Sequence, residues 1–378
     1  MQEKDLTTLT RRRFIAASAI TLFAAGKLNP ASAKKTRKLL SGVDISWLPE
    51  VERYRKNFFT RSRKPLKAIK LLKYQGVKVG RIRVFVNPDS ENGDLDRAID
   101  LAKRLKKSNL QICIDLHYSD TWADPGHQTT PAGWSTTSIE DLEDSVYNYT
   151  KQTLRKFKAA GVTPEWVQLG NEISNGMMWP LGQINSSDAT QWQNLSRIHQ
   201  AATNALRQVA PNAKSILHLD CGGDYNRVKW WLEQADQYNL TEYDIVGVSF
   251  YSQWHGELSD LQSVLNLIAK ERKQKVLIAE TAYPWIAQSF GSDVININHP
   301  PLTDCPYTKS GQANYVKKLQ NMLLALPQNR GLGIWWWEGL ATKVESNNQI
   351  FWNGGMANST LVDTDRTALP ALIQLGLK

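Results

Sequence analysis

The stretch PEWVQLGNEISNG, residues 164–176, shows the pattern that decides the fold: a predicted buried strand that ends in polar side chains. Apolar and β-branched residues lead up to Gly170 and then stop at Asn171 and Glu172. Such a short apolar run is typical of a strand inside a sheet, and the Ser, Asn and Gly that follow are typical of a loop. An amide and a carboxylate therefore stand where a buried strand is expected to end.

Seven further runs of this kind alternate with helical patterns along the chain. The eight runs are SGVDISW (41–47), VKVGRIRVFV (77–86), LQICIDLHY (110–118), PEWVQLGNE (164–172), KSILHLD (214–220), YDIVGVSFY (243–251), KVLIAET (275–281) and GLGIWWWE (331–338). Helices are expected near 62–75, 94–107, 138–160, 187–210, 226–237, 257–273, 309–326 and 365–375. Ser138 and Ser187 are candidate N-caps. The strands are continuously apolar, as in a parallel sheet that is covered on both faces.

Eight strand–helix units in a chain of 378 residues predict an α/β protein with a (β/α)8 TIM-barrel fold. An open doubly wound sheet is the alternative. That fold would need a glycine-rich phosphate loop after its first strand, and SGVDISWLPEVE contains none. No Pro- or Ser-rich linker divides the chain, so residues 34–378 are predicted to form a single catalytic domain.

Residues 1–33 have the features of an export signal rather than of a folded element. Arg11 and Arg12 form a twin-arginine pair, a short apolar stretch follows, and Ala31 and Ala33 fit a signal-peptidase site. The alternative is a basic amphipathic helix, which the small residues at the end disfavour. The apolar stretch is too short to span a bilayer. We therefore expect a periplasmic or extracellular protein without a stable membrane anchor.

The chain carries a formal net charge of +10, with much of the surplus in 34–38 and 53–73. Nucleic-acid binding is not expected, because no nucleic-acid motif accompanies the charge. A solvated helix face and weak attraction to an anionic polysaccharide remain as interpretations. The three cysteines show no disulfide framework, and the six histidines show no metal-ligand spacing, so no catalytic metal is predicted.

Polar and aromatic side chains gather at the predicted carboxyl ends of the strands, where the active sites of such barrels lie. They are Asp44, Trp47, Arg81, Arg83, Asp115, His117, Tyr118, Asp120, Trp122, Asn171, Glu172, His218, Asp220, Ser249, Tyr251, Glu280, Trp337 and Glu338. Most of the 14 Trp residues should be core, and a minority should stack against sugar rings. Asp115 and Glu338 are expected to support the site rather than to react.

Glu172 and Glu280 are the predicted catalytic pair, because they end strands on opposite sides of the barrel mouth. Cleavage of a glycosidic bond needs one carboxyl group to protonate the leaving oxygen and another to attack the anomeric carbon or activate water. Glu172 is predicted to be the acid/base and Glu280 the nucleophile. Arg81 or Arg83 would keep Glu280 ionised, with Tyr251 as a hydrogen-bond donor.

Five longer stretches closely resemble one family of such enzymes. They are RVFVNP (83–88), DLHYSDTWADPGHQTTPAGW (115–134), GNEISNGMMWPLG (170–182), GVSFYSQWHG (247–256) and AETAYPW (279–285). Together they resemble the arabinogalactan endo-β-1,4-galactanases, glycoside hydrolase family 53, over roughly residues 41–340. The resemblance implies retaining, endo-acting hydrolysis of β-1,4-galactan in the side chains of pectin. It carries the acid/base role onto Glu172 and the nucleophile role onto Glu280.

The resemblance also implies which side chains bind the polysaccharide. Arg83, His117, Asn171, Tyr251 and Trp337 would line the subsite where the bond breaks, and Trp47, Asp120, Trp122, Asp220 and Trp285 would contact neighbouring sugars. A monomer that requires no cofactor is expected. Some bacterial members hold a structural calcium near the loop of the last strand, but no ligand set can be matched to Asp363 and Asp365.

One departure concerns the segment after LHLD. Relatives usually place a bulky aromatic residue near the second position beyond it, where this chain has Gly222 and Gly223. The change would remove a stacking platform.

Two alternative functions stay open: a retaining enzyme of the same clan that cuts mannan or glucan, and a carbohydrate-binding barrel without catalytic activity.

Overall fold

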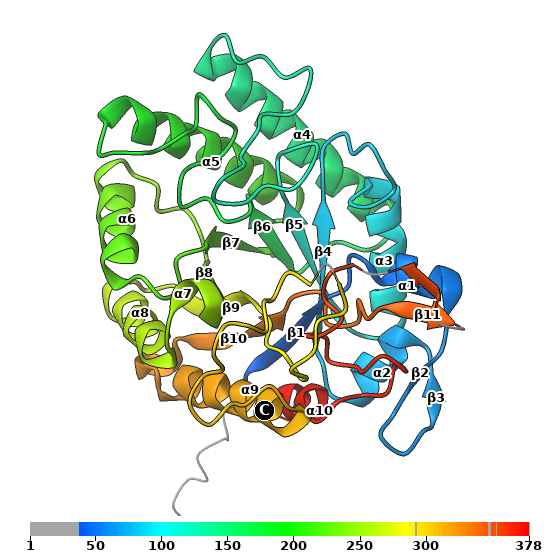
Figure 1. The fold of residues 1–378 in the computed structure, drawn as a ribbon. Coiled ribbons are helices and arrows are strands. Elements are labelled where there is room, and N and C mark those ends of the chain that lie inside the picture. Colours follow the sequence, from blue (N-terminus) through cyan, green and yellow to red (C-terminus); the bar gives the residue numbers. More distant parts are fainter. Residues whose placement is uncertain (1–37, 292, 347–348, 353, 378) are drawn as a thin grey trace, which may run out of the picture. The chain divides into compact units, whose positions relative to one another are not determined.

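The computed structural model describes residues 38–377 except 292, 347–348 and 353 (Figure 1). The predicted export signal at 1–33 lies outside these residues. In the part of the chain that is described, no helix is both long enough and apolar enough to cross a bilayer.

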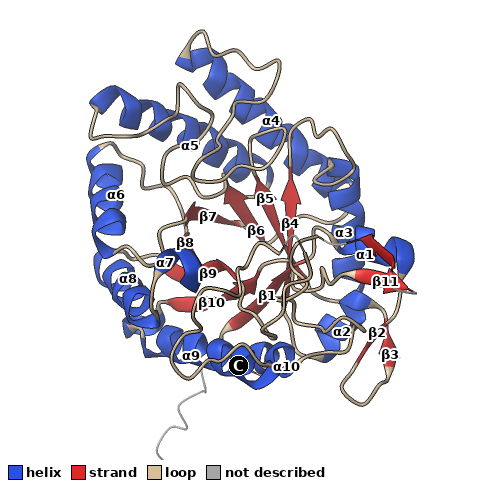
Figure 2. Ribbon diagram, viewed as in Figure 1, coloured by secondary structure: helices blue, strands red, loops and turns tan. Residues whose placement is uncertain are grey.

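Eight parallel strands close into a barrel, which confirms the predicted fold. The strands are β1 (Leu40–Asp44), β4 (Val79–Val84), β5 (Gln111–Leu116), β6 (Trp166–Leu169), β7 (Lys214–Leu219), β8 (Ile245–Phe250), β9 (Lys275–Thr281) and β10 (Gly331–Trp336). Consecutive strands pair in parallel, and β1 closes the ring by pairing with both β4 and β10. Figure 2 shows the helices as an outer ring around these strands.

The main helices of the ring follow the strands as predicted. They are α3 (Leu95–Lys107), α4 (Ile139–Ala159), α5 (Ala189–Val209), α6 (Tyr225–Gln237), α8 (Leu258–Glu271), α9 (Lys309–Ala325) and α10 (Pro370–Gly376). Ser138 caps α4 as expected, since its side chain accepts a hydrogen bond from the Asp141 amide. The predicted cap Ser187 is wrong by one residue, because Asp188 accepts from the Gln191 amide and caps α5.

The segment between β1 and β4 differs from the prediction. A short helix, α1 (Leu48–Tyr54), follows β1, and β2 (Phe58–Phe59) pairs with β3 (Pro65–Leu66) as a small antiparallel hairpin. The predicted helix 62–75 is reduced to α2 (Ala68–Tyr74). Pro65 disfavours a helix interior because it has no amide hydrogen to donate. The predicted final helix also starts late, at Pro370, where proline suits the first turn.

Three further short elements follow strands of the barrel. The four-residue helix α7 (Ser252–His255) follows β8, and the strands β11 (Val344–Ser346) and β12 (Gln349–Trp352) form an antiparallel pair after β10.

Part of the barrel interior is a cluster of buried side chains that includes Trp335, Val79, Cys113 and Leu277. The indole of Trp335 fits because residue 42 on the neighbouring strand is glycine. A Cβ at Gly42 would lie 2.0 Å from Cδ1 of Trp335. Gly42 is thus required by a close approach, and the polar side chains lie nearer the strand ends.

Candidate active site

A pocket of about 680 Å³ lies at the carboxyl ends of the strands. Glu172 reaches it from the loop after β6, and Glu280 reaches it from β9. The structure also brings most of the predicted sugar contacts to its wall: Trp47, Arg83, His117, Trp122, Asn171, Asp220, Tyr251 and Trp337. One pocket therefore combines Glu172 and Glu280 with aromatic surface.

Two predicted sugar contacts are not on the wall of this pocket. The Oδ1 atom of Asp120 accepts from the Asn87 amide at 2.9 Å, and its Oδ2 atom accepts from the Ala132 amide at 2.7 Å. Asp120 thus ties together the loops after β4 and β5. Trp285 is buried, and its Nε1 donates to the carbonyl of Ala357 at 2.9 Å. Both side chains hold loops together, and their contacts with neighbouring sugars stay predictions.

Glu172 lies three residues beyond the end of β6 in a left-handed backbone conformation, with φ of 50°. This conformation is uncommon for a residue with a side chain and costs on the order of 1–3 kcal/mol. The amide of the next residue, Ile173, donates to the carbonyl of His218 at 2.9 Å and so fixes the loop against β7. The loop is therefore held in the strained form that carries the half-buried Glu172 on the pocket wall.

A short chain of hydrogen bonds reaches the carboxyl group of Glu172 from behind. Nδ1 of His218 lies 3.0 Å from Nε2 of Gln168 and 3.1 Å from Oδ1 of Asn171. Its Nε2 shares a hydrogen bond of 2.9 Å with Oγ of Ser249. Ser249 then donates its single proton to Oε1 of Glu172 at 2.5 Å. Burial lowers the pKa of His218 to about 3, which keeps its ring neutral.

Glu280 has two partners that favour its charged form. The hydroxyl of Tyr251 donates to Oε1 at 2.7 Å, and Nη1 of Arg81 lies 3.1 Å from Oε2. Burial by the protein and the charges of Glu280 and Glu172 raise the pKa of Tyr251 well above its usual range, so the phenol stays a donor. Both oxygens of Glu280 are thus held in place.

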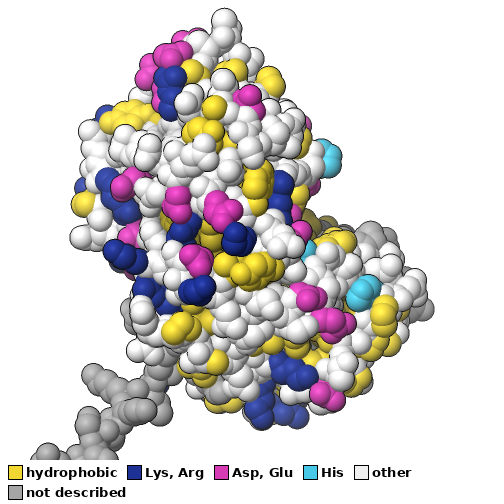
Figure 3. Space-filling model, turned by 90° about the vertical axis from the view of Figure 1, so that its left-hand side faces the viewer, with side chains coloured by type: hydrophobic (Ala, Val, Ile, Leu, Met, Phe, Trp, Pro, Cys, Tyr) yellow, Lys and Arg dark blue, Asp and Glu magenta, His cyan; other side chains and the backbone are white. Residues whose placement is uncertain are grey.

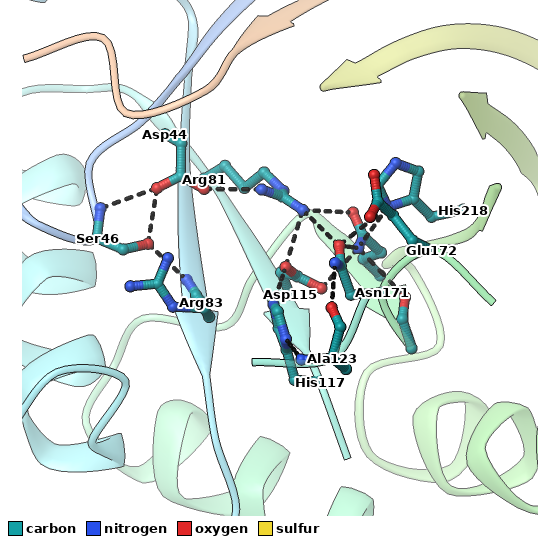
Figure 4. Close-up of polar contacts among 12 residues, drawn as sticks. Asp44, Ser46, Arg81, Arg83, Asp115, His117, Ala123, Asn171, Glu172 and His218 are labelled. Carbon is teal, nitrogen blue, oxygen red and sulfur yellow. Dashed lines mark hydrogen bonds and ion pairs between the residues drawn. The ribbon is translucent and has the colours of Figure 1, made fainter. Parts of the chain in front are cut away.

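Arg81 is the centre of the charge network beneath the pocket (Figure 4). Its guanidinium also lies 2.9 Å from Oδ2 of Asp44 and 2.8 Å from Oδ2 of Asp115. Burial alone would lower the pKa of Arg81, but the charges of Asp115, Glu280 and Asp44 raise it well above the ordinary value. The sequence left Arg81 and Arg83 as alternatives for the cation that keeps Glu280 ionised, and the contact with Oε2 of Glu280 is made by Arg81.

Arg83 serves a different part of the pocket. Its Nη1 lies 3.3 Å from Oε1 of Glu338, and its guanidinium carbon lies 3.8 Å from the ring centroid of Trp122. Glu338 also accepts from the backbone amide of Trp47 at 3.1 Å. Burial and the charge of Asp44 raise the pKa of Glu338 well above its usual range. Arg83 and Glu338 thus position the tryptophans of the wall, in line with the supporting role predicted for Glu338.

The surroundings of the two catalytic candidates push their pKa values apart. Burial raises the pKa of Glu172 well above its usual value, and the nearby charge of Glu280 adds to that rise. Burial also raises the pKa of Glu280, but there Arg81 and Tyr251 act against the rise. Glu280 therefore loses its proton first, and Glu172 keeps its proton while Glu280 is charged. This is the division that an acid and a nucleophile need.

Asn171 and His117 are fixed by contacts on both of their polar ends. Oδ1 of Asn171 accepts from Arg81 at 3.1 Å, and its Nδ2 donates to the carbonyl of Ala123 at 2.8 Å. Nδ1 of His117 accepts from the Ala123 amide at 3.0 Å, so its Nε2 donates to Asp115 at 2.9 Å. Burial lowers the pKa of His117 despite the charge of Asp115. A neutral ring and an oriented amide thus flank the glutamates.

Gly222 is in close contact with β8, and Gly223 is in close contact with the segment that follows β8. A Cβ at position 223 would lie 1.7 Å from the carbonyl oxygen of His255, and one at position 222 would lie 2.2 Å from that of Ser249. Trp254 belongs to the same segment, lines the pocket and is 56% exposed. The predicted loss of an aromatic platform is thus accompanied by an exposed indole that the sequence did not single out.

No group of three or more His, Cys, Asp or Glu side chains that could hold a metal ion occurs among the described residues. The late carboxylates Asp363 and Asp365 are instead engaged by cations. Lys309 lies 3.1 Å from Asp363, and Arg63 lies 2.5 Å from Asp365. Asp363 and Asp365 therefore do not form a recognisable set of calcium ligands.

Comparison with known proteins gives concordant matches. The sequence model of glycosyl hydrolase family 53 matches residues 40–375. An arabinogalactan endo-β-1,4-galactanase of Thermothelomyces thermophilus is 36% identical over 310 residues, which cover 77% of this chain and 88% of that enzyme. The family 53 catalytic domain of Ignisphaera aggregans superposes with a TM-score of 0.80 at 28% identity, covering 89% of this chain and 95% of that domain. A structure from a study of two fungal β-1,4-galactanases gives a TM-score of 0.77 at 30% identity, with coverage of 90% and 100%.

Proposed function

This chain belongs to glycosyl hydrolase family 53, and on that premise we propose that it is a retaining endo-β-1,4-galactanase. Its substrate would be the galactan or arabinogalactan side chains of pectin. The names of its relatives support the substrate, since the enzyme of Thermothelomyces thermophilus is an arabinogalactan endo-β-1,4-galactanase. The twin-arginine pattern supports export to the periplasm or the medium. We propose a monomer that works without a cofactor.

The observation that carries the proposal is the contrast between Glu172 and Glu280 in one pocket. Glu280 has Arg81 and Tyr251 to hold a negative charge, whereas burial and the charge of Glu280 raise the pKa of Glu172 and so keep a proton on it. An ionised nucleophile beside a protonated acid is the state in which a retaining glycosidase meets its substrate.

The reaction proceeds in two displacements. A carboxylate oxygen of Glu280 attacks the anomeric carbon while Glu172 gives its proton to the departing glycosidic oxygen, which leaves a galactosyl ester on Glu280. Glu172, now charged, takes a proton from water as that water attacks the anomeric carbon and releases Glu280. Asn171 lies beside the acid and is oriented by Arg81 to meet the sugar hydroxyl next to the reacting carbon.

The test is the release of reducing ends from linear β-1,4-galactan, with β-mannan, β-glucan and xylan in parallel. We expect short oligosaccharides from galactan alone, with the β-configuration retained in the first product seen by proton NMR. Release only from another polymer would keep the mechanism and overturn the substrate. An inverted first product would overturn the mechanism. No release of reducing ends from any of the four polysaccharides would favour a binding protein.

A further inference from the structure

A second cavity of about 420 Å³ lies on the outer flank of the barrel, between α2 and α3. Its lining includes Lys56, Lys67, Lys70, Arg104, Lys107 and Glu52. We call this cavity the basic groove. None of its lining residues belongs to the wall of the catalytic pocket, so it is a separate site.

The positive charge of the basic groove is largely uncompensated. Glu52 is its one acidic lining residue in the described chain, and it is engaged by Arg104 at 2.7 Å. Lys56, Lys70 and Lys107 are exposed and take part in no ion pair among the described side chains. Like charges that gather on one concave surface repel each other, and they lower that repulsion by attracting an anion.

The surroundings of the groove extend the same charge. Residues 53–73 hold nine Lys or Arg and no Asp or Glu. The opposite flank is different, since Figure 3 shows Lys and Arg mixed with Asp and Glu over it. On that flank Lys229 pairs with Glu233 at 2.6 Å and Arg272 pairs with Asp236 at 2.9 Å. The basic groove is therefore a local feature and not a general property of the surface.

The geometry of the groove suits an extended polymer with regularly spaced carboxylates. Lys67 and Lys70 lie about one helical turn apart along one wall, and Arg104 and Lys107 are spaced in the same way along α3. Tyr74 follows Lys70 by one turn on α2 and is 60% exposed. An exposed phenol ring offers a flat surface to the C–H face of a sugar. Neutral galactan would give these ammonium groups nothing to neutralise.

We infer that the basic groove binds an acidic polysaccharide, namely a uronate-containing backbone of the kind that carries neutral side chains in pectin. The inference rests on the proposed function for the choice of polymer. The groove would hold the charged carrier while the catalytic pocket cuts the neutral side chain. It also accounts for the basic balance of a protein whose proposed substrate has no charge.

The test compares two triple variants of the purified protein. The first, Lys56→Glu/Lys70→Glu/Lys107→Glu, reverses three exposed charges of the groove. The matched control, Lys156→Glu/Lys273→Glu/Lys317→Glu, makes the same change at exposed lysines outside it. Binding is measured by affinity electrophoresis in gels that contain polygalacturonate, and in parallel gels with its methyl ester, whose carboxyl groups are neutral.

We expect the wild type and the control to be retarded by polygalacturonate at low salt, with little retardation by the methyl ester or at raised salt. The groove variant should bind at least about tenfold more weakly, since exposed charge contacts of this number add up to that order. All three proteins should hydrolyse free linear galactan at the same rate. Galactan attached to its uronate-containing carrier should be cut faster than free galactan, and the groove variant should lose this advantage.

Three results would overturn the inference: equal retardation of wild type and groove variant, equal loss in the control, or tighter groove-dependent binding of duplex DNA or of anionic lipid vesicles than of polygalacturonate. A failure of the proposed function looks different. In that case galactan is not hydrolysed, while retardation by polygalacturonate still depends on the three groove lysines.

Discussion

The hydroxyl of Tyr251 donates a hydrogen bond of 2.7 Å to Oε1 of Glu280. This contact favours the charged form of the carboxyl group, because a donor stabilises a carboxylate more than a carboxylic acid. Two strands meet here, since Tyr251 directly follows β8 and Glu280 belongs to β9. The proposed nucleophile thus receives a hydrogen bond from the residue that directly follows the adjacent strand.

Tyr251→Phe should slow hydrolysis and move its pH dependence. Loss of a hydrogen bond to a charged group costs about 1.5–3 kcal/mol, which corresponds to roughly a 10- to 150-fold lower kcat/KM. Tyr251 opposes the rise in the pKa of Glu280, so its removal raises that pKa further. Glu280 then ionises only at higher pH, and the acid limb of the kcat/KM profile moves upward. An acid limb that does not move would contradict the role of Tyr251.

Ser249→Ala should affect the opposite limb. Ser249 donates to Glu172 and so opposes the rise in the pKa of that carboxyl group. Without the hydroxyl the pKa of Glu172 rises, and the acid keeps its proton to higher pH. The alkaline limb of kcat/KM should therefore extend upward while the acid limb stays. Ser249→Thr, which retains the hydroxyl, is the control and should leave both limbs in place.

Replacing the two glutamates should separate their roles. Glu280→Ala should abolish turnover of every substrate while the variant still binds galacto-oligosaccharides. Glu172→Ala should lose activity on polymer but still form the galactosyl ester from an aryl galactoside with an activated leaving group, which needs no proton. A burst of the released phenol, followed in a stopped-flow spectrometer, reports this step. Equal loss on both substrates would show that Glu172 is not the acid.

Trp254→Ala should weaken the binding of the polysaccharide. The indole is 56% exposed in the wall of the pocket and packs edge-on against Tyr251, with 5.2 Å between ring centroids. An aromatic contact contributes about 0.5–1.5 kcal/mol beyond its buried area, so KM should rise by roughly 2- to 12-fold with little change in kcat. Trp254→Phe keeps a ring and should recover most of the affinity. Equal KM values for all three proteins would exclude Trp254 from sugar binding.

Gly42→Ala should destabilise the barrel. Its Cβ would lie 2.0 Å from Trp335, and overpacking of a buried site costs about 1–3 kcal/mol. Urea unfolding, followed by tryptophan fluorescence, measures the loss. In the double variant Gly42→Ala/Trp335→Phe the smaller ring leaves room for the methyl group. The double variant should therefore lose less free energy of unfolding than the two single variants lose together. Strict additivity would mean that the two side chains do not collide.

The barrel was predictable because its strands are apolar along their length, but the segment from 48 to 66 was not. Strands that are apolar along their length, such as β8 and β9, have to be buried on both faces. Eight such strands alternating with helices therefore favour a parallel sheet covered by helices. Residues 48–66 form short elements whose buried apolar side chains, Leu48, Val51 and Phe58, are too few to show a regular helix or strand pattern. There the one strong local signal, Pro65, argues against a helix. The hairpin that forms instead depends on pairing with residues six and eight positions away.

The sequence was enough to place Glu172 and Glu280 near strand ends in one pocket, but it did not predict their supporting contacts. Arg81 and Arg83 are two residues apart and share one face of β4, so the sequence cannot tell which of them reaches Glu280. The answer depends on the stagger of the strands around the closed barrel. Ser249 is aligned with Glu280 across an irregular register between β8 and β9, a local shift that has no sequence signature here.

The contact between Gly223 and His255 limits how this enzyme can be engineered. An aromatic residue placed at position 223 to imitate relatives would meet backbone, not a movable side chain, because the His255 carbonyl already occupies the space of its first carbon. A single substitution would therefore push the Trp254 segment away from the pocket and exchange one aromatic surface for another. The loop after β7 is packed against the backbone that follows β8, so a chimera should take both loops from the same parent.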